Sequence, residues 1–302
     1  MDPHALAKKI IQTGNDSRLD AFGIADASAF ESYLQADSIR RDPRLSIPGA
    51  RSIIVAGVYI GGVILKSWQD ASTGRTSRLF LSGFFNDVVK ELNPVVRLLQ
   101  AEGYSAEACN DSLPNGSIIP LKLAAIRTGV GWQGKNSLLV NRRYGTFLAL
   151  GGIVTDALLE PSGETQPDRC GTCTKCQEVC PVGALDQAHI LDRTKCLSYL
   201  LQQSDLPEQL NEVVGNRIMD CEICQDVCPW NQRHVREPLQ TRVTTSFQRQ
   251  ASYWENWSTL SKLAAQTEKE YESTFGKLET SIPFSIFHRN VQIALHNYSR
   301  PK

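Results

Sequence analysis

The sequence predicts an α+β fold, with a domain of strands and helices, then a cysteine-rich domain, then a short helical C-terminal segment. Three observations support this prediction. The run over residues 51–60 is continuously apolar, which is typical of a central strand. Residues 84–102 and 257–298 repeat apolar side chains at helical spacing. Between these two helical stretches, eight of the nine cysteines lie within residues 170–228.

The N-terminal half contains further elements in a clear order. Apolar residues at helical spacing predict an amphipathic helix over 4–14, and the segment that begins at Phe22 indicates a short buried strand. Another helix is predicted over 118–128. The polar stretch over 160–169 contains Pro and Gly, and it is a natural linker into the cysteine-rich domain.

A glycine-rich segment, GVGWQGKN, occupies residues 129–136. Its glycines permit tight bends and a close approach to a large ligand. The segment superficially resembles a dinucleotide-binding loop, but it follows a predicted helix, and its strand comes afterwards, over 137–140. This is the wrong context for a Rossmann loop. We expect the apolar stretch from Tyr144 to Thr155 to be the hairpin partner of that strand.

Two cysteine runs carry the strongest functional signal. The first has the spacing C-x2-C-x2-C-x3-C-P, the second has C-x2-C-x3-C-P, and one cysteine lies between them. A 4Fe-4S cluster takes four thiolates, and in two-cluster motifs the last cysteine of a run ligates the other cluster. Cluster 1 is then assigned to Cys170, Cys173, Cys176 and Cys228, and cluster 2 to Cys180, Cys196, Cys221 and Cys224.

A zinc site and a disulfide framework are the alternatives. Zinc ribbons use two separated C-x2-C pairs, which does not explain three cysteines at every third position followed by Cys-Pro. Disulfides belong to oxidising compartments, and the N-terminus MDPHALAKKI has no recognisable export signal. We therefore expect a cytoplasmic protein whose cysteines are reduced or bound to metal.

The composition restricts the possible partners. Lys plus Arg and Asp plus Glu both number 32, so the formal net charge is zero and the basic excess of a typical nucleic-acid binder is absent. The longest apolar runs, such as 52–65, contain Gly or Tyr and are shorter than a membrane span. Neither avid RNA binding nor membrane insertion is indicated by composition.

Several stretches together resemble the epoxyqueuosine reductase family. They are CGTCTKC, KCLSYL and GNRIMDCEICQDVCPWN in the cysteine-rich region, RNVQIALHN near the C-terminus, RDPR followed by PGARSII near the N-terminus, and the glycine-rich segment. The resemblance extends over roughly residues 6–298. It implies a nitroreductase-like cobalamin- and substrate-binding domain over 1–160, a ferredoxin-like double 4Fe-4S domain over 161–240, and a helical C-terminal segment over 241–302.

The resemblance also implies an activity. The family is cytoplasmic, binds base-off cobalamin and two 4Fe-4S clusters, and reductively removes the epoxide oxygen of a queuosine precursor in tRNA through Co(I). Reduced ferredoxin or flavodoxin is the expected electron donor, tRNA a possible partner, and no membrane is expected. Two alternatives stay open. One is a reductase of a different small substrate, such as an organohalide, and the other is a non-catalytic electron-transfer protein that activates a corrinoid.

Three departures from the family pattern keep these alternatives open. Phe84, Phe85 and Asn86 stand where the family usually has Asp, Tyr and His. Asp111-Ser-Leu-Pro is present without the Glu-Arg that normally follows. The chain ends near the Ala-Leu-His-Asn match, so the family's C-terminal tRNA-contacting region is expected to be missing.

The resemblance gives Asp111 and Asn115 as catalytic candidates, and Tyr144 is a further candidate because it is a donor close to this segment. Asp111 is the expected proton donor, because burial raises the pKa of a carboxyl and lets it act as an acid. An ungapped match instead places Asn115 at that position, and the bland alternative is a solvated turn. Tyr144 is a second possible donor, or a cover for the sheet edge. We expect Cys109 to be a small buried apolar side chain.

Cobalamin contacts are expected along the glycine-rich segment and in three other places. For each residue, ordinary loop or helix-end packing is the alternative. The candidates are Arg41, Gly131, Gly134, Lys135, Asn136, Thr146 and Gln203.

Overall fold

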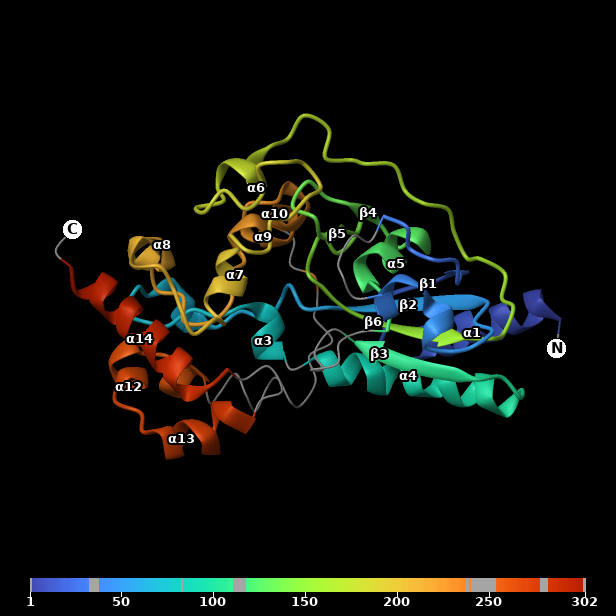
Figure 1. Cartoon of the computed structure of the whole chain (residues 1–302), viewed down its shortest axis with the longest axis horizontal. Helices are drawn as coiled ribbons and strands as arrows, with labels where there is room; N and C mark the ends of the chain where they lie inside the picture. Colours follow the sequence, from blue (N-terminus) through green and yellow to red (C-terminus); the bar gives the residue numbers. More distant parts are fainter. Residues whose placement is uncertain are drawn as a thin grey trace. The chain divides into compact units, whose positions relative to one another are not determined.

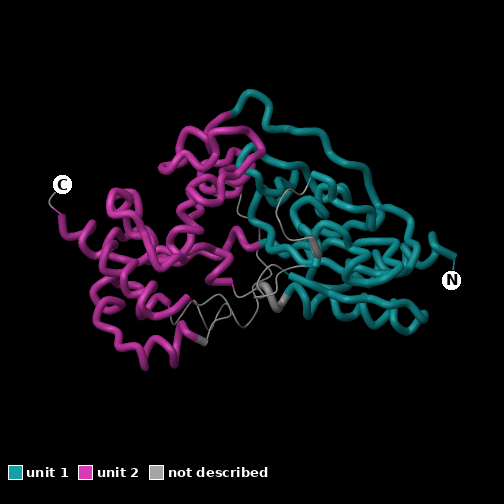
Figure 2. The backbone as a smooth tube through the Cα atoms, viewed as in Figure 1, with its two compact units in different colours: residues 1–59, 84–173 teal, residues 60–83, 174–302 magenta. Residues whose placement is uncertain are grey.

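The computed structural model of the chain describes residues 2–32, 38–82, 84–110, 118–236, 239, 254–277 and 282–300, without the side chains of 38, 39, 84–87, 235, 236 and 277. Contacts divide the chain into two compact units, each built from two stretches (Figure 2). Unit 1 combines residues 1–59 with 84–173, and unit 2 combines 60–83 with 174–302. The three domain bounds expected from the sequence remain a prediction, because these units are defined by contacts alone.

Unit 1 is built on a four-stranded antiparallel sheet. Its strands are β1 (Ala21–Asp26), β2 (Ser52–Tyr59), β6 (Leu148–Thr155) and β3 (Ala106–Asn110), in the order β1-β2-β6-β3 (Figure 1). Every residue of β2 is buried, as the continuous apolar run over 51–60 predicted for a central strand. The predicted buried strand at Phe22 is confirmed as β1.

Helices cover both faces of this sheet. α4 (Phe84–Ala101) packs on β3 and β6, while α5 (Leu121–Arg127) packs on β1, β2 and β6. Two adjacent glycines of β6 accept these helices on opposite faces, because successive residues of a strand point to opposite sides. A Cβ at Gly151 would lie 2.4 Å from Val88 of α4, and one at Gly152 would lie 2.9 Å from Leu121 of α5.

Helix α1 (Pro3–Asp16) lies beside α4 and β1, and it starts where the sequence gives a cap. The Asp2 carboxylate accepts a hydrogen bond from the Ala5 backbone N–H at 3.2 Å, and Pro3 occupies the first turn. The predicted helices over 4–14, 84–102 and 118–128 are thus confirmed, within a few residues at their ends.

The glycine-rich segment folds into a small hairpin of its own. It contains β4 (Trp132–Gln133), which pairs with β5 (Leu139–Val140). The prediction that the stretch from Tyr144 would be the hairpin partner was therefore wrong, because that stretch forms β6 in the main sheet. The glycine-rich segment follows helix α5 and not a strand, so it lacks the context of a Rossmann loop, as predicted.

Unit 2 consists mainly of short helices joined by turns. The described helices are α3 (Arg78–Ser82), α6 (Lys175–Glu178), α7 (Leu197–Leu200), α8 (Asn211–Val214), α9 (Ile223–Asp226), α10 (Pro229–Arg236), α12 (Leu260–Ala264), α13 (Glu268–Ser273) and α14 (Phe284–Ser299). Short turns of helix complete the chain at α2 (Ser38–Arg41), η1 (Pro43–Leu45), η2 (Lys66–Gln69), η3 (Glu208–Leu210) and η4 (Phe275–Lys277).

The C-terminal helices pack around an aromatic cluster. The ring centroids of Trp254 and Phe275 are 4.3 Å apart, and those of Tyr271 and Phe287 are 4.7 Å apart. Pro283 caps the start of α14, as the predicted break in the helical pattern implied. None of the helices in the described part of the chain is long and apolar enough to cross a membrane.

Candidate functional site

Two turns that carry cysteines have the same local structure. TKCQEVCP begins at Thr174 and EICQDVCP begins at Glu222. In each turn the first residue accepts a backbone hydrogen bond from the residue four positions later, at 3.0 Å in the first and 2.8 Å in the second. Each forms a single turn of helix, α6 or α9, and these two helices pack against each other. The chain therefore presents cysteines from two equivalent turns in one place.

The thiols of unit 2 influence one another. None of the nine cysteines forms a disulfide. Burial raises the pKa of Cys224, and the negative charges of Cys221, Cys196, Cys176 and Cys180 raise it further. Burial also raises the pKa of Cys221, with Cys196 and Cys180 contributing. Cys180, Cys196, Cys221 and Cys224, the cysteines assigned to cluster 2, are thus close enough for their charges to interact.

The arrangement differs from that of a single-ion site. A zinc ion needs its ligands about 2.0–2.3 Å from one point. Within the described ranges, no three His, Cys, Asp or Glu side chains are grouped so that they could hold one metal ion. A cubane does not require that grouping, because each thiolate binds a different iron atom. The backbone N–H of Ala184 donates a hydrogen bond to the Cys180 sulfur at 3.3 Å.

In unit 1 the glycine-rich segment contacts the first cysteine run. The Lys135 Nζ donates a hydrogen bond to the carbonyl oxygen of Gly171 at 2.7 Å. Burial raises the pKa of Cys170, while hydrogen bonds from the Lys135 backbone N–H and the Trp132 side chain oppose that rise. Sequence reasoning missed Trp132, since nothing in the local pattern links it to a cysteine so far along the chain.

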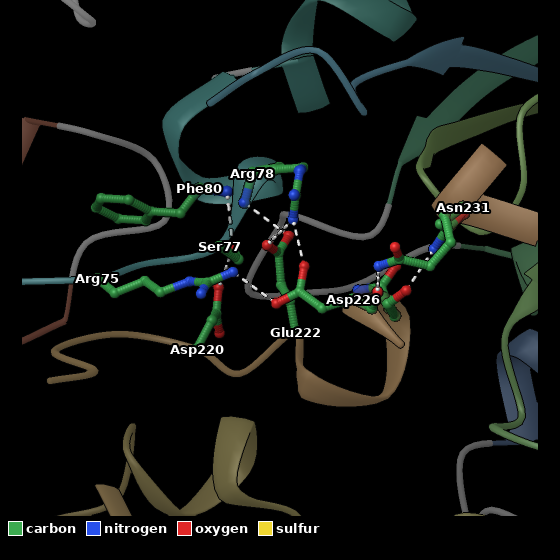
Figure 3. Close-up of polar contacts among 10 residues, drawn as sticks. Arg75, Ser77, Arg78, Phe80, Asp220, Glu222, Asp226 and Asn231 are labelled. Atoms are coloured by element: carbon green, nitrogen blue, oxygen red, sulfur yellow. Dashed lines mark hydrogen bonds and ion pairs between the residues drawn. The ribbon is translucent and has the colours of Figure 1, made fainter. Parts of the chain in front are cut away.

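Two arginines hold the second cysteine run from a distant part of the sequence (Figure 3). Arg78 Nη1 lies 2.6 Å from Glu222 Oε2 and 3.0 Å from Asp226 Oδ1, and its backbone N–H donates to Glu222 Oε1 at 2.7 Å. Arg75 Nη2 lies 2.5 Å from Asp226 Oδ2, and Ser77 Oγ donates to Asp220 at 2.7 Å. The three carboxylates lie beside or among the cysteines of this run, so the network fixes its backbone.

The central carboxylate of this network is fully enclosed. Glu222 is 4% exposed and Arg78 is 8% exposed. Burial raises the pKa of Glu222 to about 7, although the positive charge of Arg78 opposes the rise. No local sequence pattern predicts this ion pair, because its partners are 144 residues apart.

The catalytic candidates are only partly covered by the structure. Asp111 and Asn115 lie outside the described residues. Tyr144 lies in unit 1 with its ring centroid 5.5 Å from that of Tyr59, and its backbone N–H donates to Asn141 Oδ1 at 3.0 Å. Tyr144 thus packs beside the end of β2, and a role as donor remains a prediction.

Of the cobalamin candidates, three shape the β4–β5 hairpin. A Cβ at Gly131 would lie 2.2 Å from the Val140 carbonyl oxygen, and one at Gly134 would lie 2.6 Å from Val140 Cγ2. Asn136 Oδ1 accepts a hydrogen bond from the Leu138 backbone N–H at 3.2 Å. Close packing within the chain already accounts for both glycines.

The other cobalamin candidates lie apart along the chain. Arg41 is exposed, with its guanidinium 3.5 Å from the Glu31 carboxylate, whereas Thr146 is buried. Gln203, in unit 2, donates from its side chain to the Tyr199 carbonyl at 3.2 Å and accepts at its own carbonyl from Arg289 at 2.7 Å.

Cys109 lies on β3 with 6% of its surface exposed, within the apolar core of unit 1. The expectation of a small buried apolar side chain is confirmed.

Comparison with known proteins places this site in a family. Residues 169–231 match the family model of a 4Fe-4S double cluster binding domain. The chain is 31% identical over 279 residues to the epoxyqueuosine reductase of Gloeobacter violaceus, covering 90% of this chain and 84% of that protein. It is also 31% identical to the enzyme of Bacillus cereus over 255 residues, but spans only 66% of that protein's length.

Solved structures share the fold. An epoxyqueuosine reductase with an epoxyqueuosine-modified tRNA stem loop matches with a TM-score of 0.82 at 24% identity, covering 97% of this chain and 82% of that chain. A reductive dehalogenase matches with a TM-score of 0.57 at 17% identity, covering 87% of this chain and 38% of that chain. The α+β fold with a double-cluster domain and a helical C-terminus is confirmed. On the identity and coverage shared with the Gloeobacter protein, the chain belongs to the epoxyqueuosine reductase family.

Proposed function

We propose that this protein is a cobalamin-dependent iron–sulfur reductase that removes the epoxide oxygen of epoxyqueuosine in tRNA. One observation carries the proposal, which is 31% identity over 90% of the chain to a protein named epoxyqueuosine reductase. Loss of the epoxide oxygen leaves a carbon–carbon double bond and consumes two electrons and two protons, with water as the second product. The protein must therefore supply electrons one at a time, hold the substrate, and deliver protons.

The electrons pass through two 4Fe-4S clusters in this proposal. Support comes from the match of residues 169–231 to a double-cluster domain, from nine cysteines none of which forms a disulfide, and from the two equivalent turns of α6 and α9. Exchange of the last cysteine between runs gives cluster 1 the thiolates of Cys170, Cys173, Cys176 and Cys228, and cluster 2 those of Cys180, Cys196, Cys221 and Cys224. A reduced ferredoxin or flavodoxin is the proposed donor.

Cobalamin is the proposed second cofactor. Bound base-off, it would supply Co(I), which provides the reducing power that breaks a carbon–oxygen bond. Support comes from the shared fold of a dehalogenase structure whose reported mechanism is B12-dependent. The polar residues proposed to hold the corrinoid are Arg41, Lys135, Asn136, Thr146 and Gln203, while Gly131 and Gly134 would act indirectly by keeping the hairpin tight.

Side chains of the protein itself must supply the proton. A carboxyl at Asp111 can hold and release a proton, whereas an amide at Asn115 can only hydrogen-bond the substrate. The phenol of Tyr144 is the other proposed donor. The tRNA stem loop is the proposed substrate carrier, and the cytoplasm, where tRNA is modified, is the proposed location.

A second candidate function is the reduction of a small organohalide-like molecule. The substitution of Phe84, Phe85 and Asn86 at family positions that usually hold polar groups favours this alternative, since it makes that segment more apolar. The fold shared with a dehalogenase studied in complex with a bromohydroxybenzoic acid supports it too. A corrinoid-activating electron carrier without its own substrate is the remaining alternative.

One experiment separates these functions. The protein is reconstituted anaerobically with iron, sulfide and cobalamin, then incubated with an epoxyqueuosine-containing stem-loop RNA and a strong reductant. We expect nucleoside mass spectrometry to show the loss of one oxygen atom. If Asp111 is the acid, the Asp111→Asn variant should abolish the loss of the oxygen atom. Asn115→Asp is the matched variant, in which a carboxyl replaces the amide at residue 115. A bromophenol is incubated with the protein in a parallel reaction. Unchanged RNA together with a dehalogenated bromophenol would favour the second candidate function. If neither the RNA nor the bromophenol reacts, the result would favour the corrinoid-activating electron carrier.

A further inference from the structure

Lys135 joins the glycine-rich hairpin to the first cysteine run within unit 1. It occupies the turn of the β4–β5 hairpin, where the Ser137 N–H donates to the Gly134 carbonyl at 2.9 Å. The next residue, Asn136, is 4% exposed, and its side chain accepts a hydrogen bond from the Leu138 N–H. The backbone that carries Lys135 is therefore fixed by its own hairpin.

The lysine side chain reaches a carbonyl between two cysteines. Its Nζ donates to the Gly171 carbonyl oxygen at 2.7 Å, and Gly171 lies between Cys170 and Cys173 in the chain. Among the residues that the structure describes, Lys135 forms no ion pair, so this carbonyl is the acceptor that the structure gives its ammonium. A hydrogen bond from an ionised donor is roughly twice as strong as one between neutral groups.

Packing contributes little at Gly171. This residue is exposed, and a Cβ added to it would meet no heavy atom within 4 Å. Its φ of +54° lies in the left-handed region that favours glycine. Hydrogen bonds inside the loop join the Cys170 N–H to Asp168 Oδ1 at 2.7 Å and the Cys173 N–H to the Cys170 carbonyl at 3.1 Å. The Lys135 ammonium adds a bond from a segment 36 residues away in the sequence.

We propose that Lys135 is a positioning residue for cluster 1, which acts by holding the Gly171 carbonyl and with it the loop of Cys170 and Cys173. The inference rests on the proposed function for the presence of the cluster. Groups around a metal site orient its ligands, and exposed loops with few contacts open most readily. Without the ammonium, this loop should open more often and release the iron of cluster 1 faster. An ammonium has three N–H groups, so this role is compatible with the corrinoid contact proposed above.

The test measures how fast an iron chelator removes iron from the whole chain with anaerobically reconstituted clusters. Lys135→Met removes the ammonium and keeps much of the length of the side chain. We expect about half of its iron to be released at least about tenfold faster than from the parent, because a hydrogen bond from a charged group is lost. The other half should keep the parent's rate, since the ligands assigned to cluster 2 lie outside this loop.

Two further variants show whether the donor and its place matter. Lys135→Arg keeps a cationic donor, and its iron release should stay close to that of the parent. Lys9→Met is the matched control, since it removes a cation of unit 1 that pairs with Glu102.

The Cys224→Ser background identifies the cluster, because that protein should hold only cluster 1. Adding Lys135→Met to it should still speed the release of its iron. Each measurement is made with and without cobalamin, and the faster release should appear in both, because the tether does not pass through the corrinoid.

Each outcome decides the inference. Equal acceleration of all the iron in Lys135→Met would show a general loss of stability and overturn it. Unchanged release, an equal effect in Lys9→Met, no effect in the Cys224→Ser background, or an effect only with cobalamin bound would also overturn it. Uptake of only about four iron atoms by Lys135→Met and about eight by Lys135→Arg supports it, whereas reduced uptake by both contradicts it. A parent protein that takes up no cluster would instead refute the proposed function, and this inference with it.

Discussion

Replacement of Arg78 by methionine should make the stability of the protein depend strongly on pH. Methionine removes the guanidinium that lies 2.6 Å from Glu222 and 3.0 Å from Asp226, but it leaves the backbone N–H of residue 78 in place. Hydrogen bonds to charged groups contribute about 1.5–3 kcal/mol, so we expect a loss of that size near pH 7.

The pH dependence follows from Glu222. Burial raises its folded pKa from 4.5 to about 7, so the folded state binds the proton more tightly than the unfolded state. The contribution of Glu222 to the stability of the parent is therefore greatest below pH 4.5, falls as pH rises from about 4.5 to about 7, and then levels off, because Arg78 holds the ionised carboxylate. Without Arg78 the folded pKa rises further, and stability keeps falling by about 1.4 kcal/mol per pH unit. At about pH 9 the variant should have lost a further 2–3 kcal/mol relative to the parent.

The measurement is anaerobic urea unfolding at several pH values, followed by circular dichroism and by the visible absorbance of the clusters. Arg75→Met is the matched control, because its partly exposed pair with Asp226 should be worth about 1 kcal/mol or less, and the added slope should be smaller, since Arg75 lowers the pKa of Glu222 less than Arg78 does. The double variant Arg78→Met with Glu222→Gln removes both partners and should recover stability at high pH. A pH-independent loss in Arg78→Met, or no recovery in the double variant, would refute the reasoning.

Three other predictions concern single side chains. Cys224→Ser should lower the iron content to about half by removing one of the two clusters, whereas Cys109→Ser, in the core of unit 1, should leave it unchanged. Gly131→Ala should destabilise the protein by about 3 kcal/mol, because its Cβ would lie 2.2 Å from a carbonyl oxygen, whereas Gly163→Ala, with its nearest atom at 3.4 Å, should change the unfolding free energy by about 0.5 kcal/mol or less. Burial raises the pKa of Tyr271 from 10.0 to about 12, so stability should fall by roughly 2–3 kcal/mol as pH rises from 10 to 12, and Tyr271→Phe should abolish this slope in urea unfolding. Equal iron contents in the two cysteine variants, equal stabilities in the two glycine variants, or an unchanged slope in the tyrosine variant would contradict the respective prediction.

Local patterns were sufficient for most of the fold. The apolar run of β2 and the helical spacing of α4 are properties of neighbouring residues, and both elements appear where the sequence indicated them. The pairing of the glycine-rich segment was different. Its glycines allow it to fold back on β5. The prediction considered only the next apolar strand as a partner, so it missed this close approach within the chain.

The candidate site likewise has a part that the sequence predicts and a part that it does not. The spacing of the cysteines predicts the 4Fe-4S clusters directly, since cluster motifs are defined by short intervals in the sequence. The ion pair between Arg78 and Glu222 joins residues 144 positions apart, and the contact of Lys135 with Gly171 joins residues 36 positions apart. An arginine or lysine in a sequence does not specify its partner, so only the folded chain could reveal these contacts. The catalytic roles of the Asp111 carboxyl and the Asn115 amide remain predictions of the sequence alone.

Native mass spectrometry of the anaerobically reconstituted protein tests the central claim most directly. The account predicts a chain that carries the mass of two 4Fe-4S clusters, with about eight iron atoms and eight inorganic sulfides bound by eight cysteines. A chain that carries zinc, a single cluster, or intramolecular disulfides after the same treatment would contradict it.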